Sequence, residues 1–317
     1  MDQKRRRIFF AAIIIVVTVL FVLAVPPLMI VSAMTSGHVS YELSNSPMQQ
    51  IFSPENFGLS SNEQFLTTED GYQVWISEVS PKNPKAVIIY LSGIHQPSVT
   101  QFYGHAKLME ENGYASVLLE VRGHGKSDGS QVCLGYEETA DVAAVVSYVQ
   151  SQERYEGLPI VLHGVSMGGA AAIVAFGMLE DLNGLIAMSA YSSFEDVVTD
   201  TMKEYGIPDF LCEIERPFVR AALWLNFGDV VYSAVPKLQA AHIGDRPALF
   251  AAAAYDREVP PVNLMRLRDA APASAEFWLR ESGDHFVVQG SDLLHVSKDR
   301  EYCSRILLFM ERVVGNC

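Results

Sequence analysis

Residues 159–172 have the pattern of a buried strand, a sharp turn and a helix, and no other stretch constrains the fold as strongly. The apolar run at 160–162 is typical of a strand buried on both faces, and residues 170–179 are rich in helix formers. Between them lies a Gly-x-Ser-x-Gly motif centred on Ser166. Small residues on both sides of a strained serine let strand and helix approach closely. The motif predicts that Ser166 stands at the carboxyl edge of a sheet, at a helix N-terminus.

Strands and helices alternate on both sides of this stretch. Further apolar strands are predicted at 86–91, 115–121, 184–189, 247–253 and 275–280, and helices at 100–112, 137–152 and 299–314. This order predicts an α/β fold with a mainly parallel, doubly wound sheet, whose ligands bind at the carboxyl ends of the strands. A turn signal at 69–71 between two strand-like runs predicts an antiparallel hairpin at the sheet edge.

The alternation breaks between residues 191 and 245. This insertion is helical in pattern and contains many aromatic residues. We expect most of them to anchor the insertion to the core and only a few to line a pocket. Because the insertion leaves the sheet just after the strand that follows the Ser166 helix, it is predicted to be a lid over the site.

The N-terminus carries a basic cluster followed by a long apolar run. Residues 1–7 include four basic side chains, and residues 8–33 are uncharged and strongly apolar. About 20 such residues cross a bilayer, and the basic cluster stays on the cytoplasmic side. We therefore expect a cytoplasmic tail at 1–7, a transmembrane anchor at 8–33 and an extracytoplasmic remainder. The alternative is a secreted protein, cleaved from a signal peptide near Ala33, although the apolar run is longer than the 7–15 residues typical of such a peptide.

The rest of the chain divides into a linker and one domain. Residues 34–62 are polar without a sustained period, which indicates a linker, and residues 63–317 are of ordinary size for a single α/β domain. The formal net charge of −14 argues against nucleic acid as a partner.

The four cysteines, Cys133, Cys212, Cys303 and Cys317, are not spaced as metal ligands. No metal site is expected. Cys303 and Cys317 flank the last predicted helix, which holds them beyond disulfide reach unless the tail folds back. A bridge between Cys133 and Cys212 stays open, because both lie in predicted loops or insertions above the sheet.

A serine at such a turn needs a base and an acid to act as a nucleophile. The expected order is an acid after a later strand and then a histidine. Asp256 follows the strand at 247–253, and His285 follows the strand at 275–280, so both should meet Ser166 at one sheet edge. Glu258 and Asp284 are the nearest rival acids. We therefore predict a catalytic triad of Ser166, His285 and Asp256.

Together these motifs resemble those of the α/β-hydrolase superfamily, in the branch that holds serine aminopeptidase-like and lipase- or esterase-like enzymes. The resemblance covers about residues 65–314 and rests on Gly164-Val165-Ser166-Met167-Gly168, Arg122-Gly123-His124-Gly125-Lys126-Ser127, Asp256-x-x-Val259-Pro260 and Gly283-Asp284-His285-Phe286. It implies an α/β-hydrolase fold and a covalent acyl-enzyme without a cofactor. It also implies an oxyanion hole formed by the backbone N–H groups of Met167 and Ile94. Many relatives have His-Gly where this chain has Ser92-Gly93, which departs from the pattern at the Ile94 loop.

The function expected from these features is hydrolysis of a carboxylic ester or thioester, with a small-molecule or lipid-like acyl substrate. Aminopeptidase-like cleavage of an amide is an alternative, and so is a catalytically silent hydrolase-fold module that binds at the membrane surface. His95 lies close enough to the Ile94 loop to contact substrate. His124 and His163 are expected to be structural.

Overall fold

The computed structural model describes residues 3–39, 50–94 and 96–315, and its centre is one eight-stranded sheet. The strands are β1 (Asn62–Thr67), β2 (Gln73–Val79), β3 (Val87–Leu91), β4 (Ala115–Leu119), β5 (Ile160–Val165), β6 (Gly184–Met188), β7 (Ala248–Ala253) and β8 (Glu276–Arg280). Their order in the sheet is β1-β2-β4-β3-β5-β6-β7-β8. The β1–β2 hairpin pairs antiparallel at one edge, and the strands from β4 to β8 pair parallel. The predicted mainly parallel sheet is confirmed.

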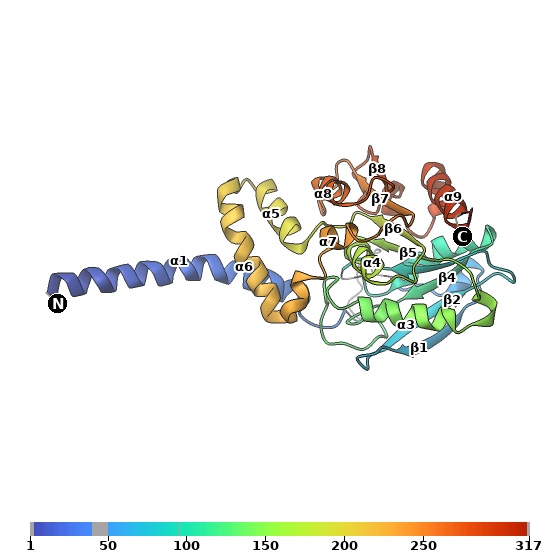
Figure 1. Ribbon diagram of the computed structural model, residues 1–317, viewed down its shortest axis with the longest axis horizontal. Coiled ribbons are helices and arrows are strands. Elements are labelled where there is room, and N and C mark those ends of the chain that lie inside the picture. The colour runs from blue at the N-terminus through green and yellow to red at the C-terminus, as the bar shows by residue number, and fades with distance from the viewer. Residues whose placement is uncertain (1–2, 40–49, 95, 316–317) are drawn as a thin grey trace.

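Helices cover both faces of the sheet (Figure 1). They are α2 (Tyr103–Glu111), α3 (Thr139–Gln150), α4 (Met167–Met178), α8 (Val262–Ala270) and α9 (Arg300–Gly315). Side chains of α3, α4 and α8 share one apolar core layer, and those of α2 and α9 share the other. Because successive residues of a strand point to opposite faces, Ile89 of β3 belongs to the first layer and Ile88 to the second. The fully buried sheet explains why its central strands are almost continuously apolar.

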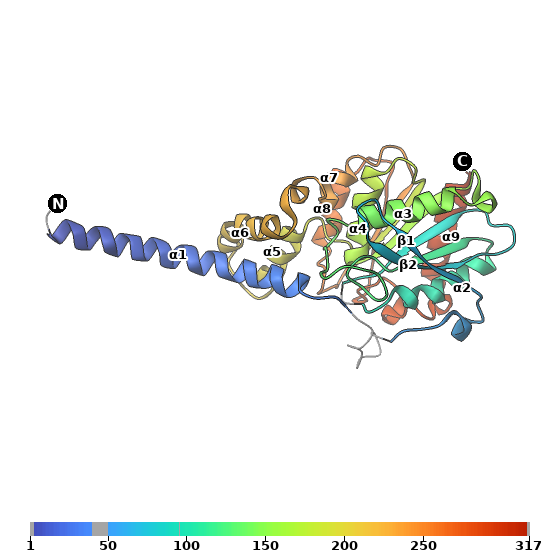
Figure 2. The ribbon, with the colours of Figure 1, turned by 90° about the horizontal axis from the view of Figure 1, so that it is seen from below.

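The insertion after β6 forms three helices, α5 (Phe194–Glu204), α6 (Asp209–Phe227) and α7 (Pro236–Ala240). Ser193 caps α5, since its hydroxyl accepts a hydrogen bond from the Asp196 N–H at 3.0 Å. Figures 1 and 2 show α5 and α6 projecting from the sheet on the side from which the N-terminal helix leaves. The insertion is therefore a helical unit that lies beside the N-terminal helix.

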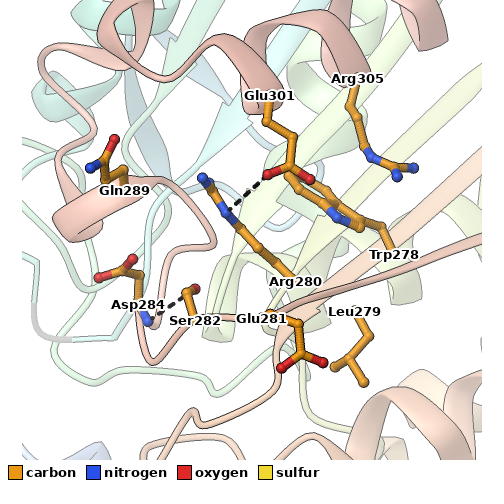
Figure 3. A pocket seen from close by; sticks show the side chains of 9 residues that line it. All are labelled: Trp278, Leu279, Arg280, Glu281, Ser282, Asp284, Gln289, Glu301 and Arg305. Atoms are coloured by element: carbon orange, nitrogen blue, oxygen red, sulfur yellow. Dashed lines mark hydrogen bonds and ion pairs between the residues drawn. The ribbon is translucent and has the colours of Figure 1, made fainter.

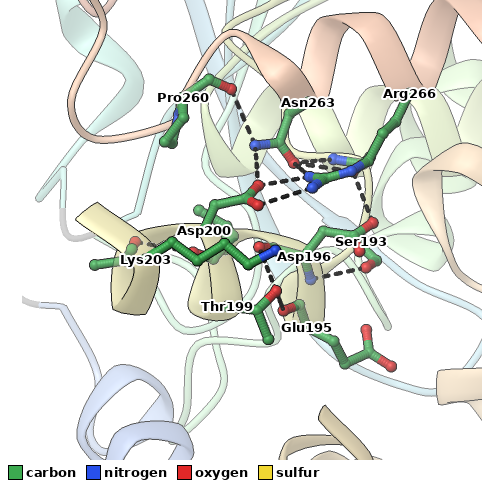
Figure 4. Close-up of polar contacts among 12 residues, drawn as sticks. Ser193, Glu195, Asp196, Thr199, Asp200, Lys203, Pro260, Asn263 and Arg266 are labelled. Carbon is green, nitrogen blue, oxygen red and sulfur yellow. Dashed lines mark hydrogen bonds and ion pairs between the residues drawn. The ribbon is translucent and has the colours of Figure 1, made fainter. Parts of the chain in front are cut away.

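Buried carboxylates of α5 hold the insertion in place (Figure 4). Asp200 receives two hydrogen bonds from Arg266 of α8, at 2.5 and 2.8 Å. Asp196 is paired with Arg216 of α6 at 2.5 Å and with Lys237 of α7 at 2.8 Å. Burial alone would raise the pKa of Asp196, but the hydrogen bonds from Lys237, Ser192 and Arg216 hold that pKa below its usual range. The acidic face of α5 thus ties together three other helices.

The N-terminal helix α1 (Gln3–Thr35) extends away from the domain and packs its last part against α6 (Figure 2). Val31 is fully buried there. By length and composition, Arg5–Thr35 is the one helix in the described ranges that is able to cross a membrane. Most of its apolar side chains are exposed, Phe21 by 66%. An exposed apolar surface of this extent is typical of segments that contact a membrane or another protein.

The segment that follows α1 is bound to the domain. The Val132 N–H donates to the carbonyl of Thr35 at 3.1 Å, and the Val39 N–H donates to the carbonyl of Gly123 at 2.8 Å. His38 contacts the carbonyl oxygens of Gly129 and Gly125, each at 2.9 Å. The start of the predicted linker at 34–62 is therefore docked, and its later part contains a short 3₁₀ helix at Pro54–Phe57.

The bridge between Cys133 and Cys212 that the sequence left open is not formed. Both are free thiols. Cys133 lies 3.4 Å from a carboxylate oxygen of Glu137, and Cys212 lies 3.6 Å from the carbonyl of Ile207 within its own insertion. Cys133 lies in a loop and Cys212 in the first turns of α6, and each thiol is buried among its local neighbours. Cys317 lies outside the described residues.

Candidate active site

Ser166 stands at a sharp turn between β5 and α4. Its backbone has φ 54° and ψ −123°, a conformation that L-residues rarely adopt. A Cβ placed on Gly164 would lie 2.1 Å from the carbonyl oxygen of Gly168, and one on Gly168 would lie 2.4 Å from the carbonyl oxygen of Leu91. The two glycines of the motif are thus required by close backbone contacts. The turn leaves Ser166 only 8% exposed at the N-terminus of α4.

His285 and Asp256 meet at the same edge of the sheet, as the sequence predicts. Asp256 follows β7, and His285 lies in the loop after β8. The His285 Nδ1–H donates to Asp256 Oδ2 at 2.7 Å. The other oxygen of Asp256 accepts the N–H groups of Glu258 at 2.8 Å and Val259 at 3.1 Å. These bonds fix the carboxylate, and both side chains are nearly buried.

Ser166 is not joined to His285 by a hydrogen bond among the described residues. The free nitrogen of the imidazole, Nε2, lies 3.8 Å from a carboxylate oxygen of Glu258 instead. The Glu258 side chain is 72% exposed. Catalytic hydrogen bonds are often long or absent without substrate. The arrangement therefore pairs two of the three predicted residues and places Glu258, the rival acid, on the opposite nitrogen.

The predicted oxyanion donors come from two segments that adjoin Ser166. Met167 is the first residue of α4, where N–H groups have no partner within the helix. Ile94 follows Gly93, and a Cβ placed on Gly93 would lie 3.3 Å from the Ser166 Cβ. The Gly93 N–H itself donates to Gln96 Oε1 at 2.5 Å, which shapes this loop. The loop after β3 therefore runs beside the serine, and His95 lies outside the described residues.

The Arg122 loop serves the fold. The Arg122 guanidinium is buried and binds Asp70 at 2.6 Å and Asp141 at 2.8 Å. A Cβ placed on Gly123 would lie 2.1 Å from the carbonyl oxygen of Gln131, so the motif forms a tight turn. His124 is buried within this turn.

His163 belongs to the central strand β5 and is fully buried, as expected for a structural histidine. Its Nε2 lies 3.4 Å from the Tyr302 hydroxyl, which also contacts His105 Nε2 at 2.7 Å. Burial lowers the pKa of His163 to about 3, and burial together with the neighbouring His163 lowers that of His105 well below its usual value. Both imidazoles are therefore neutral at physiological pH.

Two of the cavities formed by the described residues bear on the site. One of about 520 Å³ lies beside β8 and is lined by charged side chains, including Arg280, Asp284 and Glu301 (Figure 3). None of Ser166, His285 and Asp256 lines it. The other, of about 460 Å³, lies between α1 and α5, is mostly apolar and reaches Glu258. The contribution of α1 to this cavity was not predicted, because no local pattern in the sequence links residues so far apart.

Within the described ranges, no group of three or more His, Cys, Asp or Glu side chains is arranged to hold a metal ion. The chemistry available at the edge is that of a hydroxyl, an imidazole, a carboxylate and backbone N–H groups. This combination suits attack on a carbonyl group.

A family model described as serine aminopeptidase, S33 matches residues 82–272. The uncharacterized protein YqkD of Bacillus subtilis is 24% identical over 219 residues, which cover 68% of this chain and 70% of that protein. The uncharacterized membrane protein YNL320W of Saccharomyces cerevisiae is 22% identical over 251 residues, covering 76% of this chain and 80% of that protein.

Solved structures share the fold at low identity. The esterase Pf2001 of Pyrococcus furiosus aligns with a TM-score of 0.63 and 20% identity, over 82% of this chain and 94% of that chain. The proline iminopeptidase of Mycobacterium smegmatis aligns with a TM-score of 0.55 and 14% identity, over 80% of this chain and 99% of that chain.

The sheet order, the serine turn and these likenesses define an α/β hydrolase. The chain belongs to the serine aminopeptidase S33 family, whose model spans more than half of its length, and it is a serine hydrolase of the α/β type. The resemblance in the sequence is confirmed.

Proposed function

We propose that this hydrolase cleaves a carboxylic ester or thioester through an acyl-enzyme on Ser166, with His285 as the base and Asp256 as its partner. The observation that carries the proposal is the 2.7 Å hydrogen bond between His285 and Asp256 at the sheet edge that also holds the strained Ser166. The bond fixes the imidazole tautomer that leaves Nε2 free to accept a proton. The helices α5 to α7 act as the lid.

The reaction runs in two steps. The Ser166 hydroxyl turns toward Nε2, gives its proton to His285 and attacks the carbonyl carbon. The oxyanion accepts hydrogen bonds from the N–H groups of Met167 and Ile94, and the leaving alcohol or thiol takes the proton from Nε2. Water then gives a proton to Nε2 and attacks the acyl carbon. Ser166 leaves with that proton, and a carboxylic acid is released.

Labelling with a fluorophosphonate probe tests the nucleophile. We expect wild-type protein to be labelled at Ser166 and Ser166→Ala to lose both labelling and ester hydrolysis. Ser193→Ala is a control at another buried serine, and it should keep labelling. If Ser166→Ala were labelled as strongly as wild type, the assignment would be wrong.

Amide hydrolysis is the second candidate, because the exposed carboxylate of Glu258 lies 3.8 Å from His285 Nε2 and offers a partner for a substrate amine. The apolar cavity beside it favours esters with apolar acyl chains. Turnover of p-nitrophenyl esters against aminoacyl p-nitroanilides separates the two. Faster ester turnover supports the first proposal.

We further propose that α1 is an uncleaved anchor, with the hydrolase domain on the extracytoplasmic side. The basic cluster at residues 4–7 and the exposed apolar surface of α1 support this orientation. Cleavage near Ala33 is the alternative. The intact mass of the mature protein decides, because a species that begins near Met34 excludes the anchor.

A further inference from the structure

The apolar cavity between α1 and α5 has one wall made by the N-terminal helix. Ile30 and Met34 of α1 face Val197 and Met202 of α5 across it. Its volume of about 460 Å³ lies within the range of about 300–1,000 Å³ that is usual for small-molecule sites. Its lining holds few polar groups, which belong to Thr201, Tyr205 and Glu258. Such a space suits a hydrocarbon chain.

None of Ser166, His285 and Asp256 lines this cavity, and Glu258 is the lining residue that lies next to them. This side chain lines the cavity, and its carboxylate oxygen lies 3.8 Å from His285 Nε2. A carbonyl group attacked by Ser166 must lie next to Nε2, so an acyl chain attached to it can run past Glu258 into the cavity. An acyl chain on that carbonyl would therefore reach the apolar space past the Glu258 side chain.

The other end of the cavity lies at the level where a membrane would end. Ile30 is 23 residues beyond Arg7, which is about 35 Å along a helix. The hydrocarbon core of a bilayer is about 30 Å thick, so with Arg7 at one surface Ile30 lies just past the other. The helix α6, which packs against α1, also carries exposed apolar side chains, including Phe210, which is 64% exposed, and Ile214.

From these contacts we propose that the α1–α5 cavity is the acyl-chain site of the enzyme and that it takes the chain of a membrane lipid ester directly from the outer part of the bilayer. The membrane helix then forms part of the substrate site as well as the anchor. This inference rests on the proposed esterase function and names its substrate class.

The test uses the full chain in phospholipid nanodiscs, with p-nitrophenyl decanoate and p-nitrophenyl acetate as probes. Met34→Trp fills the cavity from α1, and Val197→Trp fills it from α5. We expect the decanoate-to-acetate ratio of kcat/KM to fall at least tenfold in each variant. Leu20→Trp, at an exposed position of the same helix, is the matched control and should keep the wild-type ratio. A ratio within twofold of wild type in both cavity variants would overturn the proposal.

A second measurement tests the cavity without turnover. Full-length protein is photolabelled with a diazirine-bearing fatty acid, and the adducts are located by mass spectrometry. Adducts at residues 30–34 and 194–207 that excess decanoate removes support the site. Adducts confined to residues 9–21 contradict it. If wild type hydrolyses neither ester but these adducts form, the esterase function fails while the cavity keeps its ligand class.

Discussion

At the scale of single residues, Asp256 and Glu258 show how position decides between two acids of one loop. Both carboxylates contact His285, but on opposite nitrogens. Asp256 is buried and held by two N–H groups, whereas Glu258 is exposed. A fixed, buried carboxylate can set the imidazole tautomer, and a solvated one cannot.

Exchanging each acid for its amide tests this difference. Asp256→Asn should lower kcat by about 10⁴-fold, because the wrong tautomer is stabilised. Glu258→Gln should change kcat/KM for esters by less than about fivefold, since an exposed ion pair is worth about 1 kcal/mol or less. Steady-state kinetics with p-nitrophenyl acetate measures both. A larger loss of kcat in Glu258→Gln than in Asp256→Asn would make Glu258, and not Asp256, the carboxylate that supports His285.

The serine turn makes a second prediction at this scale. Gly164→Ala should unfold the site, because the added carbon would lie 2.1 Å from the carbonyl oxygen of Gly168. Backbone atoms cannot move aside cheaply, so we expect the free energy of unfolding to fall by about 4 kcal/mol or more. Thermal denaturation measures it. Gly157→Ala is the control for a glycine with open space, and it should cost about 1 kcal/mol, since its φ is +70°.

Local patterns were sufficient to place Ser166, Asp256 and His285 after their strands, because each lies in a short motif that follows an apolar run, and their catalytic roles stay a prediction. They could not predict that Nε2 faces Glu258 or that Met34 lines a cavity. These facts depend on how distant elements pack, and no spacing within either segment encodes them.

At the scale of elements, ion pairs hold the insertion together and join it to the rest of the domain. From the sequence, aromatic side chains were expected to anchor it, and these pairs were not predicted. The sequence indicated a lid from the break in alternation at 191–245. The arrangement of α5 depends instead on Asp196 and Asp200, whose partners come from three different helices. Asp196 lies in the first turn of α5, where acidic residues are common, and Asp200 lies in the middle of the helix, so neither carried a distinguishing signal.

Breaking one of these pairs should loosen α5. Asp200→Asn removes the charge that binds Arg266 twice, and we expect a loss of about 1–3 kcal/mol in stability. Hydrogen exchange should speed up in α5 more than in α4. Asp209→Asn, whose carboxylate is exposed and 3.7 Å from Lys203, is the matched control and should change stability by less than about 0.5 kcal/mol. Equal effects of the two variants would contradict the proposal that buried carboxylates of α5 hold the insertion on the domain.

Element boundaries followed the sequence closely where strands were buried on both faces. The strand predicted at 184–189 is observed as Gly184–Met188, and the helix predicted at 299–314 as Arg300–Gly315. The strand predicted to reach residue 121 ends at Leu119, where the backbone turns into the Arg122 loop. The helix α8 was missed, because its charged positions hide its apolar face.

At the scale of the whole molecule, buried histidines link stability to pH. The folded-state pKa of His163 is about 3, below the unfolded value of about 6.5. The unfolded chain therefore binds protons that the native protein excludes, and stability falls as pH drops below about 6.5. Glu138 acts in the opposite direction, because burial raises its pKa to about 7.

His163→Phe isolates the histidine contribution. The variant loses the 3.4 Å contact with Tyr302 but also removes Nδ1, which has no hydrogen-bond partner in the described part of the chain. The difference in stability, variant minus wild type, should be about 2 kcal/mol larger at pH 5 than at pH 8, because only the wild type is destabilised by acid at this position. Urea denaturation at the two pH values measures this difference. The same difference at both pH values would mean that the fold does not lower the pKa of His163.

The residues that follow α1 are docked on the domain, and this docking limits how far the active site can move from the membrane. Val39 and His38 fasten the chain to the loop at residues 123–129 within four residues of the end of α1. If α1 spans a bilayer, the domain cannot swing on a tether, and its site stays at one height above its own membrane. Substrate must then arrive by lateral diffusion. The rate of hydrolysis should therefore depend on the mole fraction of lipid ester in the membrane that holds the enzyme. Adding vesicles that contain the ester but no enzyme should not change this rate.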